Sequence, residues 1–181
     1  HHEFLQQIRH GLAGGEFELF YQPKVAMETR RLTGAEALIR WNHPRRGRLL
    51  PADFLRMIED TELEIELGDW VVATALGQLR QWQLEGFAID LSINISAYHL
   101  QSKGFVQKLK EGAERLGATD CLRRLQIDFL TRRIDVAVGA NANADAARRD
   151  ATQFERAVGG LDLPPIAIEA TIHHRLAFAH L

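Results

Sequence analysis

Residues 34–41 read GAEALIRW, and this stretch indicates the fold more clearly than any other part of the chain. Side chains alternate between the two faces of an extended strand, so Glu36, Leu38 and Arg40 share one face. The small and apolar residues between them share the other face. A charged side chain that is buried on such a strand must be paired, or must hold a metal ion or a ligand. The stretch therefore predicts a strand with one apolar face and one functional face.

A second strand repeats this pattern. Residues 88–96 read AIDLSINIS, in which Asn94 is a polar amide inside an otherwise core-like strand. A carboxylate oxygen and an amide oxygen that come from two strand ends suit a hard divalent cation such as Mg²⁺. Two alternatives stay open from the residues alone. Glu36 could pair with Arg40 on its own strand, and Asn94 could be a hydrogen-bonded core amide.

The rest of the pattern predicts alternating strands and helices. In chain order, it predicts a helix over 3–12, strands over 17–23 and 34–41, helices from 52 and over 68–84, a strand over 88–96, a helix over 105–116, a strand over 125–130 and a short strand at 166–168. Strand, helix, strand in this order is typical of an α/β fold with parallel strands. Catalytic groups of such folds lie at the carboxyl ends of strands, where Arg40, Trp41 and Asn94 fall.

The bulk composition is that of a soluble globular domain. The chain has 181 residues, of which 46% are hydrophobic and 25% charged, and its formal net charge is −2. No apolar run approaches the ~20 residues of a membrane helix, and no signal-peptide pattern opens the chain. The near-neutral charge argues against general nucleic-acid binding. We expect one domain, in which His1 and His2 are a tag remnant.

Two groups of reactive residue types predict no site. Cys121 is the single cysteine, so no internal disulfide can form, which fits a reducing cytoplasm. It has no obvious partner histidine, and we expect it in the core or at a helix end. His173, His174 and His180 lack a recognised zinc spacing, so we expect an exposed polar cluster there.

Several motifs together resemble a known family. They are Tyr21-Gln22-Pro23, residues 36–41, His43-Pro44, Gly47, residues 51–54 and residues 93–96. In this order and at this spacing they resemble the first half of an EAL domain, over residues 17–117. EAL domains are the bacterial family that hydrolyses, or in degenerate members only binds, cyclic di-GMP. The resemblance implies a TIM-barrel-like (β/α)8 fold.

The same resemblance implies a catalytic centre. Glu36 and Asn94 match catalytic metal ligands of the family, which implies Mg²⁺ or Mn²⁺ as the cofactor. Two such ions ~3.5–4 Å apart can activate water and clamp the oxygens of a phosphodiester. Hydrolysis of cyclic di-GMP then gives the linear dinucleotide.

Further positions are implied to contact the dinucleotide. Gln22, Leu38 and Pro51 match family positions that touch it, and Asp53 lies beside them. A core leucine at 38 and a helix-start aspartate at 53 remain open alternatives. Arg40 has the guanidinium geometry that holds a phosphate through two hydrogen bonds. The nearby basic loop either collects anions or is simply solvated; it contains Arg45, Arg46 and Arg48.

The last third of the chain departs from the family. The later carboxylate, paired-aspartate, lysine and acidic motifs do not occur intact, and two alignments compete. In the first, residues 125–131 replace the carboxylate strand and Asp128 takes the place of its metal-binding glutamate. In the second, residues 125–128 replace the lysine strand, residues 161–181 resemble the acidic strand with its helix, and Glu169 is the metal ligand. A (β/α)8 barrel needs ~250 residues, so 181 residues imply an incomplete barrel.

These features predict one EAL-like domain over residues 1–181. It consists of a lead-in helix over 1–16, a well-matched part over 17–117 and a diverged part over 118–181. The resemblance implies a cytoplasmic cyclic di-GMP phosphodiesterase. It also implies that the protein forms a homodimer and that a longer signalling protein adds a sensory or cyclase-like domain. The alternative is an inactive receptor that binds cyclic di-GMP and signals through partner contacts, and a structural remnant is a third possibility.

Overall fold

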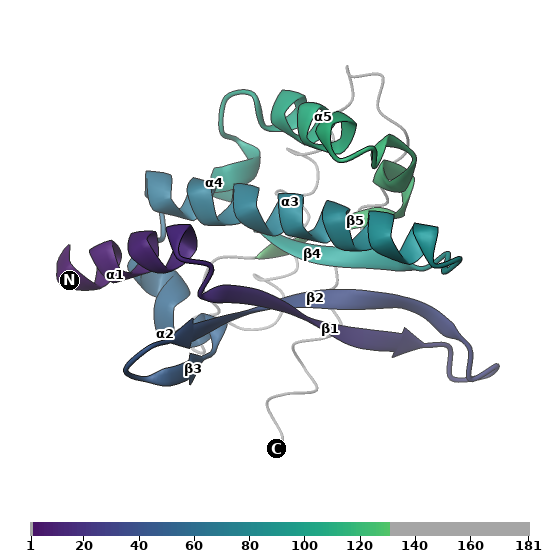
Figure 1. Cartoon of the computed structure of the whole chain (residues 1–181), viewed down its shortest axis with the longest axis horizontal. Coiled ribbons are helices and arrows are strands. Elements are labelled where there is room, and N and C mark those ends of the chain that lie inside the picture. The colour runs from purple at the N-terminus through teal and green to yellow at the C-terminus, as the bar shows by residue number, and fades with distance from the viewer. Residues whose placement is uncertain (1, 131–181) are drawn as a thin grey trace, which may run out of the picture.

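The computed structural model describes residues 2–130, which form a twisted sheet with helices along one face (Figure 1). The helices are α1 (His2–Ala13), α2 (Pro51–Phe54), α3 (Glu62–Leu84), α4 (Ala97–Leu100) and α5 (Phe105–Arg115), with 3-10 turns η1 (Leu55–Met57) and η2 (Thr119–Arg124). The strands are β1 (Phe17–Val25), β2 (Leu32–His43), β3 (Gly47–Leu49), β4 (Asp90–Ser96) and β5 (Leu125–Leu130). The predicted α/β class is confirmed.

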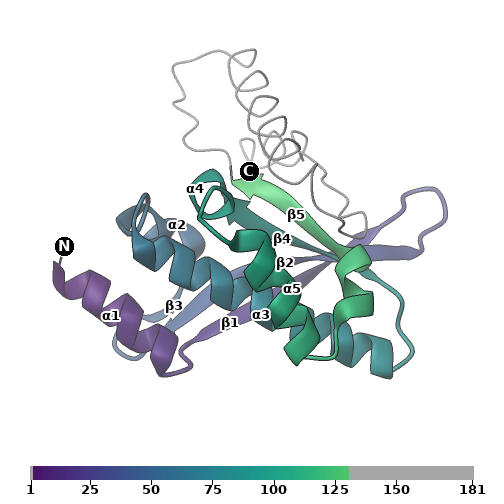
Figure 2. The ribbon, with the colours of Figure 1, turned by 90° about the horizontal axis from the view of Figure 1, so that it is seen from above.

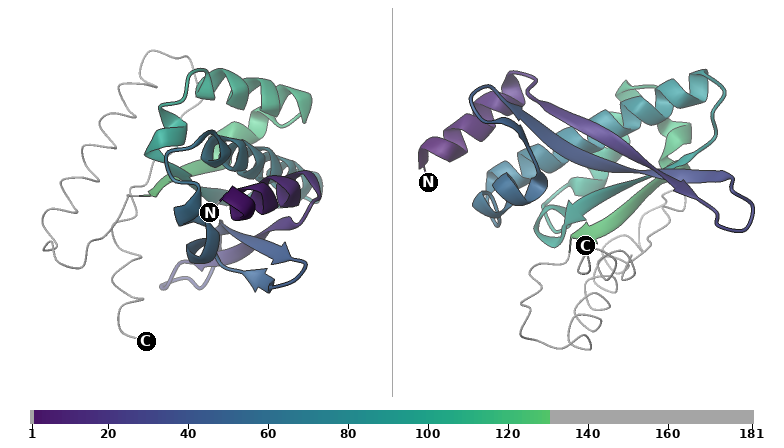
Figure 3. Two further views of the ribbon diagram at one scale, coloured as in Figure 1. Left: turned by 90° about the vertical axis from the view of Figure 1, so that its left-hand side faces the viewer. Right: turned by 90° about the horizontal axis from the view of Figure 1, so that it is seen from below.

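The order of the strands is β1-β2-β4-β5, with β3 attached to β2. β1 and β2 form an antiparallel hairpin, whereas β2, β4 and β5 run parallel. Parallel neighbours need a crossover connection, and α3 supplies it between β2 and β4 while α5 supplies it between β4 and β5. From above, both helices cross in front of the strands (Figure 2), and from below the strands lie in front of α3 (Figure 3).

The main core lies between this sheet and the helices. Alternate residues of β4 point into it, so Leu91, Ile93 and Ile95 are almost completely buried. The helical side comes mainly from one stripe of α3, which includes Ala75 and Leu76. Burial of apolar side chains supplies most of the favourable free energy of such a layer. The opposite face of the sheet is consequently left to the polar residues.

A second core surrounds Trp41 at the other end of β2. The Trp41 indole is fully buried, and its ring stacks on Phe17 with a centroid distance of 5.2 Å. Its Nε1 donates a hydrogen bond to Glu16 Oε2 at 2.8 Å. Ile8 of α1 belongs to the same cluster, so the lead-in helix closes this end of the sheet. Trp41 does lie near the carboxyl end of β2, but it faces the core.

The chain after β2 differs from the prediction. The helix expected from residue 52 is only the short α2 followed by η1, and Leu63 belongs to α3, which begins six residues earlier than predicted. The break falls at Asp60, whose φ of 62° does not continue a right-handed helix. Glu62 and Glu64 in the first turn favour the new start, because carboxylates there interact well with the helix dipole. β3 and α4 were not predicted.

Some predicted features fall on residues after position 130. The short strand at 166–168 and the histidines at 173, 174 and 180 lie outside the described residues. Among residues 2–130, no helix has both the length and the apolar character needed to cross a membrane.

Two glycines of α3 provide a matched test of the packing between α3 and α4. A Cβ placed on Gly68 would overlap the His99 ring, whereas a Cβ on Gly77 would meet nothing within 4 Å. We expect Gly68→Ala to lower the free energy of unfolding by about 1–3 kcal/mol, because the crowding outweighs the better helix propensity of alanine. Gly77→Ala should raise it by up to about 1 kcal/mol. Urea titration of both variants measures these changes, and a stabilised Gly68→Ala variant would contradict the packing.

Candidate functional site

The face of the sheet opposite the main core carries polar side chains from every strand of its path. Cross-strand neighbours share a face, and the register pairs Gln22 with Glu36, Glu36 with Ser92, and Asn94 with Asp128. We call this surface the polar face; its members include Gln22, Lys24, Glu36, Leu38, Arg40, Ser92, Asn94, Gln126 and Asp128. Because polar groups gather on this side of the sheet, it is the candidate side for binding a ligand.

The centre of the polar face is a hydrogen bond between two strands. Asn94 Nδ2 of β4 donates to Glu36 Oε1 of β2 at 2.9 Å. Both side chains are half-buried, so neither is fully solvated. The bond brings together the two residues that the sequence analysis singled out, and it does not use the amide oxygen of Asn94.

Asp128 extends this pair to a third strand. It lies opposite Asn94 in the parallel register of β4 and β5, and only 5% of it is exposed. β5 pairs directly with β4, which is the arrangement that the first alignment requires. Glu169, the metal ligand of the second alignment, lies outside the described residues.

The donor set of these three residues fits a hard cation. It consists of two carboxylates and one amide, all oxygen ligands of the kind that Mg²⁺ and Mn²⁺ prefer. Among residues 2–130 no three His, Cys, Asp or Glu side chains gather as a metal cluster, so an ion here would need the amide of Asn94 as well. Whether an ion binds at these residues stays a prediction.

A chain of hydrogen bonds continues along the polar face toward the amino ends of the strands. Lys24 Nζ donates to Ser92 Oγ at 2.7 Å, and Ser92 Oγ donates to Gln126 Oε1 at 3.0 Å. Because Ser92 is the register partner of Glu36, the ammonium group adds positive charge close to the carboxylates. Lys24 was not among the predicted site residues, although its position two residues after Gln22 places it on the same strand face.

Arg40 does not neutralise Glu36. Its Nη1 donates to the backbone carbonyl oxygen of Ile39 at 2.8 Å, and the guanidinium carbon lies 5.5 Å from the centre of the Phe20 ring. The ion pairs of the described residues include none between Glu36 and Arg40. The strand-internal pair that the sequence left open is therefore absent here.

The remaining residues predicted to contact the dinucleotide differ in their exposure and in their place in the fold. Gln22 is exposed and lies opposite Glu36, and Leu38 is half-buried on the same face. Pro51 begins α2. Asp53 Oδ2 accepts a hydrogen bond from the backbone N–H of Leu50 at 2.8 Å, so this carboxylate stabilises the start of α2. The helix-start role of Asp53 is thus present in the structure.

Comparison with known proteins decides the family. A model of the EAL domain matches residues 5–135 of the chain. The chain belongs to the EAL domain family. Its similarity to curated proteins is confined to one part of each of them, as the following two matches show.

A cyclic di-GMP phosphodiesterase of Pseudomonas aeruginosa is 42% identical over 92 residues, which are 51% of this chain and 16% of that protein. The bifunctional diguanylate cyclase/cyclic di-GMP phosphodiesterase MucR of the same species is 35% identical over 115 residues, which are 62% of this chain and 17% of that protein. This EAL domain therefore spans about one sixth of the length of these relatives.

Solved structures agree with the fold. The MucR phosphodiesterase in its c-di-GMP complex superimposes with a TM-score of 0.66 at 28% identity, over 83% of this chain and 60% of that one. The EAL domain of Xanthomonas citri FimX in complex with c-diGMP gives a TM-score of 0.67 at 24% identity, over 90% of this chain and 58% of that one. The second likeness concerns the fold alone.

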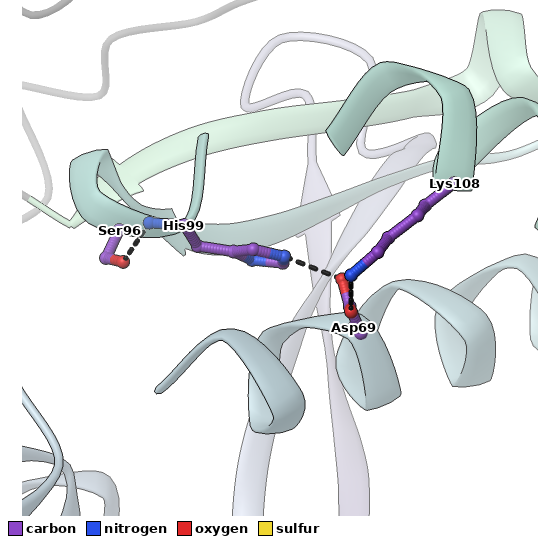
Figure 4. Close-up of polar contacts among 4 residues, drawn as sticks. All are labelled: Asp69, Ser96, His99 and Lys108. Carbon is purple, nitrogen blue, oxygen red and sulfur yellow. Dashed lines mark hydrogen bonds and ion pairs between the residues drawn. The ribbon is translucent and has the colours of Figure 1, made fainter. Parts of the chain in front are cut away.

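This EAL domain holds a second polar cluster, formed by Asp69, His99 and Lys108 (Figure 4). His99 Nε2 lies 2.7 Å from Asp69 Oδ1, and Lys108 Nζ donates to Asp69 Oδ2 at 2.9 Å. Ser96 Oγ accepts from the backbone N–H of His99 and lies away from the ring nitrogens, so the group is not a nucleophilic triad. The cluster instead ties α4 to α3 and α5 behind the end of β4.

Burial decides the charge state of this cluster. It lowers the pKa of His99, an effect that the Asp69 hydrogen bond and charge partly oppose and that Lys108 supports. Burial also raises the pKa of the neighbouring Glu64, against a hydrogen bond with Ser96 that lowers it. His99 is therefore neutral around pH 7 and accepts a proton in the fold less readily than in the unfolded chain.

Cys121 carries no nucleophilic site. It is buried in η2, and its Sγ donates to Gln83 Oε1 at 3.4 Å. Burial raises the pKa of the thiol, which keeps it protonated and unreactive. The expectation of a core cysteine is confirmed.

The lowered pKa of His99 predicts a pH-dependent stability. Because the folded-state pKa lies below the unfolded value, the free energy of unfolding should fall as pH drops from about 7 toward 5. A His99→Gln variant lacks this effect, so its stability should change less over that window, while the Glu64 contribution of opposite sign remains in both proteins. Urea titrations at several pH values measure the difference.

The exposed His10 of α1 provides the matched control for this measurement. His10→Gln should keep the wild-type pH dependence, because it changes an exposed side chain of α1 and leaves the contacts of His99 with Asp69 in place. Equal pH dependence in His99→Gln and wild type would show that His99 does not carry the effect.

Proposed function

We propose that this EAL domain binds cyclic di-GMP on its polar face and hydrolyses one phosphodiester bond to give the linear dinucleotide. The observation that carries the proposal is the 2.9 Å contact between Glu36 and Asn94, with Asp128 in register beside it. A carboxylate rarely stays half-buried opposite an amide and a second carboxylate unless a cation or ligand belongs there.

In this proposal Glu36, Asn94 and Asp128 hold Mg²⁺ or Mn²⁺ through oxygen atoms. When bound, a divalent ion lowers the pKa of a coordinated water and neutralises charge that develops on the phosphate oxygens. The three residues supply ligands for one ion, and the second ion of a two-metal centre rests on the family resemblance. The protein's part is to fix these oxygens on neighbouring strands before the substrate arrives.

Other residues of the polar face would bind and orient the substrate. In this proposal the guanidinium of Arg40 holds a phosphate, and Gln22, Leu38 and Pro51 contact the dinucleotide, as the family resemblance implies. Lys24 adds a positive charge on the same face. These local cations matter, because the formal net charge of the chain is −2 and offers no general attraction for an anionic ligand.

The named relatives support the substrate class. One is called a cyclic di-GMP phosphodiesterase, and the solved MucR domain is a phosphodiesterase in complex with c-di-GMP. We also propose a cytoplasmic location, a homodimer and a sensory or cyclase-like partner domain, all of which come from the family. A concentration series in analytical ultracentrifugation tests the dimer.

The alternative is a receptor that binds cyclic di-GMP without cutting it. The observation in its favour is that an aspartate, which is one methylene shorter than glutamate, stands at position 128, and that the later family motifs are not intact. The shorter side chain of Asp128 would bind a catalytic metal ion more weakly, while the contacts of other residues to the bases and phosphates would remain. Binding and turnover must therefore be measured separately.

We predict that Glu36→Gln lowers the rate of linear dinucleotide formation with Mg²⁺ by at least about 100-fold, because it removes a negatively charged oxygen ligand. Chromatography of the reaction with cyclic di-GMP measures the rate, and calorimetry with Ca²⁺ in place of Mg²⁺ measures binding. Glu85→Gln, at the solvated end of α3, is the matched control and should react like wild type.

The outcomes separate the hypotheses. Product formation that depends on Glu36 supports the enzyme, and binding without product supports the receptor. If the wild-type chain neither binds nor hydrolyses cyclic di-GMP, the proposed function is wrong.

A further inference from the structure

Phe20 is an aromatic side chain in an unusual place. It lies opposite Leu38 in the β1–β2 register, on the polar face and two residues from Gln22. Its exposed fraction is 39%, whereas Phe17 of the same strand is 5% exposed in the core. A large apolar ring that stays exposed among residues 2–130 loses the benefit of burial, so its place on the polar face suits a contact with a ligand.

Two guanidinium groups lie beside this ring. The guanidinium carbon of Arg48, from β3, is 4.7 Å from the ring centre, and that of Arg40 is 5.5 Å from it. Arg48 also contacts Glu18 Oε1 at 3.5 Å and donates through Nε to Asn42 Oδ1 at 3.4 Å. The carboxylate of Glu18 therefore lies beside two positively charged guanidinium groups, those of Arg40 and Arg48. The site as a whole attracts an electron-rich partner.

A purine base has the chemistry that such a site recognises. Its flat ring stacks on an aromatic side chain or on a guanidinium plane. Guanine presents two acceptors on one edge, O6 and N7, which match two parallel N–H groups of an arginine. Adenine has a donor amino group in place of O6 and does not satisfy the same fork.

We infer that Phe20 and Arg48 bind one guanine base of cyclic di-GMP, with Phe20 stacking on the base and Arg48 donating to O6 and N7. This inference rests on the proposed function, since it places the base on the same polar face as Glu36. Phe20 is level with Leu38, two residues and about 7 Å along β2 from Glu36. One nucleotide can therefore place its base on Phe20 and its phosphate near the carboxylate.

The position of the two arginines divides their roles. Arg40 belongs to the same strand as Glu36, whereas Arg48 belongs to β3, which pairs with residues 41–43 at the carboxyl end of β2. A phosphate near Glu36 is thus closer to Arg40, and a base farther out is closer to Arg48. Arg48 is the specificity-determining residue of this arrangement, and Phe20 supplies affinity without distinguishing the bases.

The test is calorimetric binding of cyclic di-GMP and of cyclic di-AMP to the full chain with Ca²⁺. Phe20→Ala should weaken cyclic di-GMP binding by about 5- to 100-fold, and Phe20→Tyr should bind nearly like wild type because its ring still stacks. Leu84→Ala, at an apolar residue that is 64% exposed at the end of α3, is the control for loss of exposed apolar surface. Phe20→Leu serves where Phe20→Ala does not fold.

Arg48→Gln tests the recognition of the base. It should weaken cyclic di-GMP binding about tenfold or more and leave cyclic di-AMP binding almost unchanged, so that the preference for guanine falls. Arg46→Gln is the matched control, because Arg46 also lies over a phenylalanine ring, that of Phe4 at 5.1 Å, but outside the polar face. Its binding should equal that of wild type.

The results separate this inference from the proposed function. If the wild-type chain binds cyclic di-GMP and the Phe20 variants bind it equally well, the inference is overturned and the function stands. An equal loss for both dinucleotides in Arg48→Gln would overturn the base-reading role of Arg48. Failure of the wild-type chain to bind either dinucleotide would overturn the proposed function itself, and this inference with it.

Discussion

The parallel pairing of β2 with β4 is the constraint on which the candidate site depends. The register places Glu36 opposite Ser92, and a shift of one residue would turn Glu36 toward the core and Ala37 toward the ligand side. Gly34 stabilises this register, because a Cβ at that position would lie only 2.8 Å from the carbonyl oxygen of Asp90. Close approach of the two backbones at the start of β2 thus sets which side chains meet farther along.

The apolar face and the polar face are two results of one alternation. Ile93 and Ile95 turn toward α3 and α5 and hold β4 in place, while Asn94 between them turns the other way. The helical layer is held by polar contacts as well, since Asp69 joins His99 of α4 to Lys108 of α5. Packing on one side therefore positions chemistry on the other.

Much of this arrangement could be predicted from the sequence, because alternation within one strand is a local property. This alternation directly predicts the strands at 34–41 and 125–130. It also predicts that Glu36 and Arg40 share a face. The break before α3 could not be predicted in the same way, since apolar spacing continued through Leu63 although α2 and η1 end by Met57 and Asp60 is left-handed.

Contacts between strands that are distant in the chain could not be predicted from the sequence either. The Lys24–Ser92–Gln126 chain depends on the registers of three strands, which no local pattern specifies. The same holds for Phe20 and Arg48, which meet only because β3 folds back on β2. The placement of Asp128 beside Asn94 favours one of the two alignments, and metal binding at these residues stays a prediction.

Trp41 has a consequence for its neighbour in the chain. Its indole is enclosed by Phe17 and Phe54 and bonded to Glu16, so the backbone at this end of β2 has little freedom to move. The backbone at Arg40 is therefore already fixed, and binding of an anion by its guanidinium would restrict only the torsion angles of the side chain. The entropy lost on binding is correspondingly small, which is the advantage of preorganisation.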